Sequence, residues 1–347
     1  MIRESKLTEP LEGRLQPRLL IALPALNEEK TVGTVIGQIP TKFEGIASSE
    51  VVVIDDGSED QNKSLSEAAG ARVISHGERC GVGVAFQTAL REALVGGYDL
   101  LVMMDSDGQF DPQNLPKLLG PVLAGKADFT TASRFIDSSL VPEMPRMKLW
   151  GNRQMSRIVS SLTRKKYYDV SCGFRCYSRV AMLSLNLTGD FTYTQEVFLN
   201  LAFKKLRVHE VALRVKGERE FGESRVASNL FKYAWRASSI IIRSYRDYRP
   251  LRFFGTLAIL NLVPAVLLSL FLGGHYLNSG SFTPHKWAGF LSGFFFLFGF
   301  LLLTVGMVSD MLTRHRLYLE EILFRQRAEG SLSFRESEKN EASPGRR

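Results

Sequence analysis

Two long uncharged runs in the C-terminal part of the chain constrain its fold more than any other feature. Residues 253–272 read FFGTLAILNLVPAVLLSLFL and residues 287–309 read WAGFLSGFFFLFGFLLLTVGMVS. As a helix with about 1.5 Å of rise per residue, each run is roughly 30 Å long, the thickness of the hydrocarbon core of a bilayer. Core helices of soluble proteins are rarely apolar on every side. We therefore predict two membrane-spanning helices, the first kinked at Pro264.

Arginines flank this pair of runs on both outer sides. They are Arg243, Arg246, Arg249 and Arg252 before the first run, and Arg314, Arg316 and Arg325 after the second. The connecting segment carries only His275, His285 and Lys286 as potentially cationic residues. Because positive charge is enriched on the cytoplasmic side of membrane proteins, we predict a hairpin with both ends in the cytoplasm. This makes the chain an integral protein of a plasma, inner or endoplasmic reticulum membrane.

The remaining segments differ in composition. Residues 226–250 combine apolar residues at helical spacing with Lys232, Arg236 and Arg243, which is typical of an amphipathic helix on an anionic membrane surface. An ordinary globular helix is the alternative. Residues 1–16 lack an apolar stretch, so we expect an N-terminal extension without a secretory signal. The predicted units are 1–16, a folded domain over 17–225, the interfacial helix 226–250, the hairpin 251–313, and a cytoplasmic helix with a disordered polar tail over 314–347.

The first 225 residues alternate between strand-like and helix-like segments. Residues 18–23, 51–54, 72–74 and 100–103 are short apolar runs, whereas 27–39 and 82–95 have apolar residues at helical spacing. This alternation predicts a doubly wound α/β domain with a mostly parallel sheet. A chain that is 45% hydrophobic is too apolar for disorder, and three cysteines exclude a disulfide framework. We see no coiled-coil or repeat period.

Acidic clusters follow three of the predicted strands, where ligands of such sheets bind. They are the segments Pro24–Glu29, Asp55–Ser58 and Asp105–Gln109. Asp105 and Asp107 alternate along an extended segment, which points both carboxylates to one side. With the amide oxygen of Gln109 they form an oxygen-only site suited to Mg²⁺ or Mn²⁺. Neither a G-x-G-x-x-G nor a Walker A loop follows any strand, which argues against dinucleotide and P-loop sites.

Other side chains complete this candidate site. Asp55 and Asp56 cannot both cap the following helix, so one is available for the ribose or base of a nucleoside. The candidates for binding substrate phosphates are Arg79, Arg134, Arg153 and Arg175. The five histidines show no metal-binding spacing, and Cys172 and Cys176 are better explained as packing residues than as a zinc site.

The motifs PALNE, DDGS, DSDGQ, TASRF, DVSCGFRCYSR and FGESR, followed by a membrane hairpin, resemble family 2 glycosyltransferases, and more narrowly the dolichyl/polyprenyl-phosphate sugar synthases (dolichol-phosphate mannosyltransferase-like). The similarity covers about residues 17–325. It implies a GT-A fold, a UDP- or GDP-linked sugar donor, a divalent metal, a polyprenyl-phosphate acceptor and inversion at the anomeric carbon. No nucleic-acid partner is expected. The hairpin leaves room for a homo-oligomer, although no motif sets its size.

Roles follow from the resemblance residue by residue. Donor binding falls to Pro24, Leu26, Glu28, Asp55, Asp56, Asp105 and Arg134; the metal to Asp105, Asp107 and Gln109; and acceptor-phosphate binding to Arg153, Arg219, Ser224 and Arg225. Asp107, Arg134 and Glu196 are the implied catalytic residues. The chain departs from the family at Leu26, where Tyr or Phe is usual; at residues 79–83 (RCGVG), where Asn-x-Gly-x-Gly is usual; and at Arg225, where Lys is common.

The prediction is therefore an inverting, metal-dependent transfer of a sugar to a polyprenyl phosphate. A phosphate monoester is already an anion near neutral pH, so no general base is required. A processive polysaccharide synthase is disfavoured, because the Gln-x-x-Arg-Trp signature and further membrane spans are missing. Two alternatives stay open: an enzyme acting on another lipid or glycan acceptor, and a catalytically silent membrane scaffold.

Overall fold

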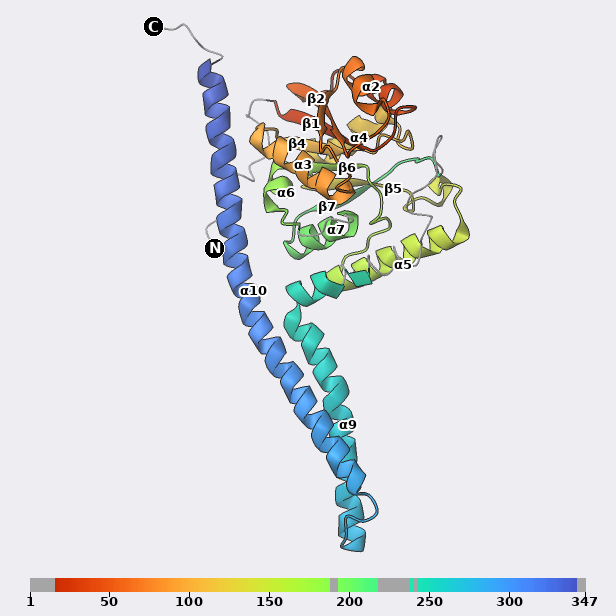
Figure 1. The fold of residues 1–347 in the computed structure, drawn as a ribbon, viewed down its shortest axis with the longest axis vertical. Helices are drawn as coiled ribbons and strands as arrows, with labels where there is room; N and C mark the ends of the chain where they lie inside the picture. The colour runs from red at the N-terminus through yellow and green to blue at the C-terminus, as the bar shows by residue number, and fades with distance from the viewer. Residues whose placement is uncertain (1–15, 188–192, 218–237, 240–241, 342–347) are drawn as a thin grey trace. The chain divides into compact units, whose positions relative to one another are not determined.

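The computed structural model describes residues 16–187, 193–217, 238–239 and 242–341, with side chains placed up to residue 330. Two compact units make up the chain (Figure 1). The first contains residues 1–241 together with 323–347, and the second contains residues 242–322.

The first unit is built on a seven-stranded sheet. Its strands are β1 Arg18–Ala25, β2 Ser48–Asp55, β3 Arg72–Ser75, β4 Leu100–Met103, β5 Phe129–Ser133, β6 Arg175–Ser178 and β7 Val208–Ala212. The order is β3-β2-β1-β4-β6-β5-β7, and only β6 runs antiparallel to its neighbours. The predicted α/β fold with a mostly parallel sheet is confirmed, and each predicted strand lies within an observed one.

Helices cover both faces of this sheet. They are α1 Val32–Gly37, α2 Asn62–Ala68, α3 Val82–Val95, α4 Leu115–Leu123, α5 Arg146–Thr163, α6 Arg179–Ser184 and α7 Thr194–Phe203, with 3-10 turns η1 Pro112–Asn114 and η2 Ser138–Leu140. Because side chains alternate along a strand, Leu20 and Ala22 of β1 join the core that includes α3, whereas Leu19 and Ile21 join the core that includes α1 and α4. Burial on both faces explains why β4 (LLVM) is apolar at every position and β1 at every position after Arg18.

The second unit contains two long helices, α9 Pro250–Ser279 and the first part of α10 Lys286–Glu341. Small residues bring the two helices together: a Cβ added at Gly299 would lie 2.8 Å from Leu262 Cγ, and Ser292 Oγ donates to the Ala265 carbonyl at 2.8 Å. Only 11% of the most apolar window of α9 and 17% of that of α10 are buried. Helices this apolar and this exposed are candidate membrane spans, as predicted.

The C-terminal part of the chain differs from the prediction. A disordered polar tail was expected within residues 314–347, but α10 continues to Glu341. Within the first unit, Ala328 is buried, and the Arg327 guanidinium donates to the Leu185 carbonyl at 2.9 Å and to Asn186 Oδ1 at 3.0 Å. These contacts give the polar segment a surface on which to fold, which its composition alone does not reveal.

The predicted interfacial helix 226–250 lies mostly outside the described residues. Its described end, residues 242–248, is helical. The first 15 residues also lie outside the described part of the chain.

Candidate active site

The three acidic segments follow β1, β2 and β4, which are neighbours in the sheet. Parallel pairing aligns Ala25 with Asp55 and Ala22 with Met103, so the carboxyl ends of the three strands meet at one edge. Ser106 Oγ donates to the Pro24 carbonyl at 2.9 Å, which ties the loop after β4 to the end of β1. The topology therefore brings together the segments that the sequence singled out separately.

The loop after β1 is held against the loop after β2. Asn27, with a positive φ of 53°, donates its amide N–H to Ser58 Oγ at 2.9 Å and accepts from the amide of Glu59 at 2.9 Å. Glu28 is buried, and Thr31 Oγ1 lies 3.5 Å from its Oε2. Leu26 is half-buried. Hydrogen bonds between the two loops give this part of the site a defined shape.

Both aspartates of the DDGS motif are buried and have protein partners. Asp55 accepts from Asn62 Nδ2 at 2.9 Å and from Ser75 Oγ at 3.0 Å. Asp56 accepts from the amides of Cys80 and Gly81 and lies 3.1 Å from His76 Nδ1. These contacts connect β2 to β3 and to the segment before α3.

The glycine of the same motif is required by close packing. Gly57 has a φ of 77°, and a Cβ added there would lie 2.6 Å from the carbonyl carbon of Glu78. Backbone from residues 78–79 therefore covers Gly57 directly. The 76–81 segment, which overlaps the residues 79–83 that depart from the family pattern, is held by both Asp56 and this contact.

The predicted metal-binding side chains have the chemistry of a hard-cation site. Asp107 is 2% exposed, and its Oδ1 accepts from the amide of Gln109 at 3.0 Å. Gln109 donates Nε2 to the Lys216 carbonyl at 3.1 Å, which leaves its amide oxygen as the atom that could coordinate a metal. Asp105 is half-buried, and its Oδ2 lies 2.9 Å from the position a Cβ would occupy at Gly173. Carboxylate and amide oxygens held this way fit Mg²⁺ or Mn²⁺.

Arg134 follows β5, as predicted, and its guanidinium binds an acidic residue that sequence reasoning missed. Its Nε and Nη2 donate to Asp169 at 2.6 and 2.9 Å, and the Arg134 amide donates to the same carboxylate at 3.2 Å. Asp169 is fully buried. The aspartate was part of the quoted DVSCGFRCYSR motif, but nothing in a linear sequence pairs it with an arginine 35 residues away.

Glu210 of β7 binds the backbone of the segment that contains Asp169. Its carboxylate accepts from the amides of Tyr168 at 2.9 Å and Asp169 at 2.8 Å. Burial raises the pKa of Glu210 against the opposing effect of these hydrogen bonds. Glu210 therefore fixes the backbone that carries Asp169, and with it the position of the Arg134–Asp169 pair.

One of the predicted phosphate-binding arginines is a core residue instead. Arg175 is fully buried, and its guanidinium donates to the carbonyls of Cys172 at 2.7 Å, Val170 at 2.9 Å and Thr194 at 2.9 Å. The ring of Phe198 lies 5.1 Å from its Cζ. The prediction for Arg175 was wrong, because three backbone carbonyls, two in the 170–172 loop and one at the start of α7, satisfy a guanidinium as well as a phosphate does.

Other predicted residues are placed as follows. Arg79 and Arg153 are exposed, the latter on α5, and Glu196 is buried in the first turn of α7. Cys172 and Cys176 are buried packing residues, as expected, and burial raises the pKa of each thiol to about 12. Arg219, Ser224 and Arg225 lie outside the described residues.

Comparison with known proteins places this site in a family. The sequence model of glycosyl transferase family 2 matches residues 20–184. An uncharacterised protein of Methanocaldococcus jannaschii is 30% identical over 199 residues, which are 56% of this chain and 80% of that protein. The polyprenol monophosphomannose synthase of Mycolicibacterium smegmatis is 25% identical over 69% of this chain and 92% of its own length.

A solved structure shares the fold. Glucosyl-3-phosphoglycerate synthase from Mycobacterium tuberculosis, crystallised with Mn²⁺, UDP and glucosyl-3-phosphoglycerate, has a TM-score of 0.53 and 22% identity, covering 69% of this chain and 83% of that chain. The predicted GT-A-like fold is thereby confirmed. From its motifs, its fold and these relatives, the chain belongs to glycosyl transferase family 2 and is a glycosyltransferase.

Proposed function

We propose that this enzyme transfers a sugar, with inversion, from a nucleotide-diphosphate sugar to a polyprenyl monophosphate at the cytoplasmic face of a membrane. The observation that carries the proposal is that one chain combines a carboxylate-rich site with candidate membrane spans. Carboxylates lie at the sheet edge where β1, β2 and β4 end, and two helices apolar enough to span a membrane follow later in the sequence. A soluble donor and a lipid acceptor require both features. The relative named polyprenol monophosphomannose synthase supports the lipid-phosphate class.

In this proposal the donor binds across the edge of the sheet. Pro24, Leu26 and Glu28 line the nucleoside side with Asp55 and Asp56. The buried positions and mutual hydrogen bonds of the two loops keep these groups in place before the donor arrives, which lowers the entropic cost of ordering them. UDP and GDP remain alternative nucleotides.

Asp105, Asp107 and Gln109 would hold a Mg²⁺ or Mn²⁺ ion. Such an ion, when bound, neutralises charge on the departing nucleoside diphosphate. The backbone N–H of Gln109 donates to Asp107 Oδ1 at 3.0 Å and so orients this carboxylate. The lack of a side chain at Gly173 leaves room for the Asp105 carboxylate. The family neighbour crystallised with Mn²⁺ and UDP supports this class of ion.

The acceptor needs orientation rather than deprotonation, because its phosphate is already an anion. We assign Arg153, Arg219, Ser224 and Arg225 to this phosphate, and Glu196 to the sugar side of the site. Asp169 holds two donors of the Arg134 guanidinium in a bidentate pair. In this proposal, the Arg134 guanidinium binds substrate phosphate in an orientation that Asp169 fixes, and Asp169 is a positioning residue.

Membranes that contain the full chain provide the test. They are incubated with a panel of radiolabelled UDP- and GDP-sugars and polyprenyl phosphate, and lipids are extracted into organic solvent. We expect label in the organic phase with one donor, and its loss in Asp107→Asn. The matched control is Asp111→Asn, an exposed aspartate whose cap on Gln113 an asparagine can replace.

Two results would contradict the proposal. Transfer of label only to water-soluble products with every donor would exclude a polyprenyl-phosphate acceptor. Absence of any nucleotide release, in protein that is folded and membrane-bound, would favour a silent scaffold.

A further inference from the structure

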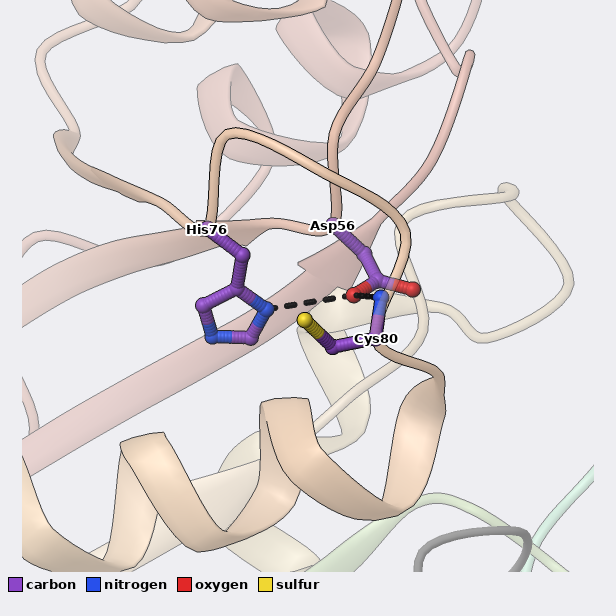
Figure 2. Close-up of side chains that lie close together, drawn as sticks. All are labelled: Asp56, His76 and Cys80. Atoms are coloured by element: carbon purple, nitrogen blue, oxygen red, sulfur yellow. Dashed lines mark hydrogen bonds and ion pairs between the residues drawn. The ribbon is translucent and has the colours of Figure 1, made fainter.

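Three metal-binding side chains of different types converge next to the DDGS motif. Figure 2 shows Asp56, from the end of β2, facing His76 and Cys80, from the segment between β3 and α3. The possible ligand atoms, a carboxylate oxygen, a ring nitrogen and the Cys80 sulfur, all lie within 4.8 Å of one another. None of these atoms belongs to the Asp105–Asp107–Gln109 set.

Hydrogen bonds to Asp56 hold the backbone of Cys80 and Gly81 in place. The backbone N–H of Cys80 donates to Asp56 Oδ1 at 2.9 Å, and that of Gly81 donates to Oδ2 at 2.8 Å and to Oδ1 at 3.1 Å. Gly81 has a φ of 100°, which favours glycine, and it is the residue before the first turn of α3. A carboxylate offers about four lone-pair directions, so these three contacts leave Asp56 one direction for a cation.

A second contact orients the imidazole. His76 Nε2 lies 3.0 Å from Thr88 Oγ1 of α3, and His76 Nδ1 lies 3.1 Å from Asp56 Oδ1. A hydroxyl can accept from an imidazole N–H. With the ring proton on Nε2 and donated to Thr88, the Nδ1 lone pair is directed at the space shared with Asp56 and Cys80. Metal-binding histidines are commonly fixed by such a partner on the other ring nitrogen.

The spacing fits a tetrahedral ion with small adjustments. Ligand atoms about 2.0–2.1 Å from Zn²⁺ at tetrahedral angles lie roughly 3.3 Å apart, and a sulfur ligand lies somewhat farther from the others. The Nδ1–Oδ1 separation of 3.1 Å is within a few tenths of an ångström of that value. Cys80 is exposed, so its side chain is able to close any remaining gap of about 1 Å.

We propose that Asp56, His76 and Cys80 form a site for Zn²⁺ or a similar borderline-soft divalent cation, with solvent as the fourth ligand. Thiolate and imidazole select such ions over Mg²⁺, whereas the oxygen-only ligands Asp105, Asp107 and Gln109 select the reverse. Binding releases the thiol proton of Cys80 to solvent. The Nδ1–H that hydrogen-bonds Asp56 in the absence of the ion is also lost, and Nε2 carries the single ring proton, so the imidazole stays neutral. Two bonds to the ion then replace the Nδ1–Asp56 hydrogen bond. The ion then links β2 to the 76–81 segment, and it competes for the Asp56 carboxylate with the nucleoside that the proposed function places there.

Cobalt absorption tests the site without relying on activity. The full chain, purified in detergent and stripped with a chelator, is titrated with Co²⁺ in the presence of excess Mg²⁺, which fills the oxygen-only site. We expect a thiolate-to-cobalt charge-transfer band that saturates at one ion per chain and is removed by Zn²⁺. Cys80→Ser should abolish the band, and His76→Gln should weaken Co²⁺ binding roughly tenfold or more.

Two further variants separate this site from its surroundings. Thr88→Val keeps the shape of the side chain but removes the partner of Nε2, so it should also weaken Co²⁺ binding, by roughly ten- to a hundredfold. Asp107→Asn should leave the band unchanged. No band in the wild-type protein at saturating Co²⁺, a band that persists in Cys80→Ser, or a band insensitive to His76→Gln would each overturn the proposal. Thermal unfolding of each variant verifies that it is folded.

Discussion

Adding one methyl group at Gly173 should damage catalysis while leaving the fold intact. Gly173 precedes β6 and has no left-handed φ, so alanine can adopt its backbone. A Cβ there would lie 2.9 Å from Asp105 Oδ2 and 3.2 Å from Oδ1. The Asp105 carboxylate is therefore the group that must move in Gly173→Ala.

The size of the effect follows from these distances. Ordinary carbon–oxygen contacts begin at about 3.4 Å, so the carboxylate must retreat by roughly half an ångström. Functional groups in active sites need placement within about 0.5 Å, and a displacement of 1 Å can cost roughly a hundredfold in rate. We expect about a tenfold loss of transfer rate and a higher metal requirement. Since Asp105 is only half-buried, the stability cost should stay near 1 kcal/mol, at the low end for overpacking.

The assay is sugar transfer at increasing Mn²⁺, with thermal unfolding measured in parallel. Gly37→Ala is the control, because a Cβ at that exposed position of α1 meets no atom within 4 Å. A Gly173→Ala enzyme with the rate and metal requirement of Gly37→Ala would refute the argument that Gly173 makes room for a working Asp105. A large loss of stability in Gly173→Ala would also refute it, since the damage would then lie in the fold.

Three further predictions concern stability. Asp169→Asn should lower the free energy of unfolding by about 3–5 kcal/mol, because it leaves the Arg134 guanidinium without its buried carboxylate; urea denaturation measures this, and no loss would disprove the pairing. Gly57→Ala should cost about 1–3 kcal/mol in thermal unfolding, because of its φ of 77° and the 2.6 Å approach to Glu78; wild-type stability would contradict this contact. Burial raises the pKa of Glu210, so this carboxyl binds its proton more readily in the folded state, and its stabilising contribution is largest in acid and is lost as pH rises through the raised pKa. In denaturation at several pH values, the stability of Glu210→Gln relative to wild type should therefore increase from acidic to neutral pH, and a constant difference would show that the pKa is not raised.

Much of the architecture could be predicted because it depends on local patterns. Uncharged runs of 20 and 23 residues have few alternatives to a membrane-spanning helix, and α9 and α10 contain them. Strand β4 and all of β1 after Arg18 are apolar, and acidic segments follow both strands closely in sequence. Parallel pairing of neighbouring strands was then sufficient to bring Asp55 and Asp105 to the same edge of the sheet.

Partners distant in sequence were decided by the tertiary structure alone. The sequence does not reveal whether an arginine in a motif binds a substrate or a group of the protein itself. Only the fold shows that Arg175 donates to three backbone carbonyls and that Arg134 is paired with Asp169. The same is true of Cys80, whose meeting with Asp56 and His76 depends on how the segment before α3 folds over Gly57. Local patterns determine which segments become strands, helices and spans, because backbone propensity and burial act over a few residues. Hydrogen bonds form between any groups that the folded chain brings close, including groups far apart in sequence. A local stretch of sequence therefore does not determine these partners.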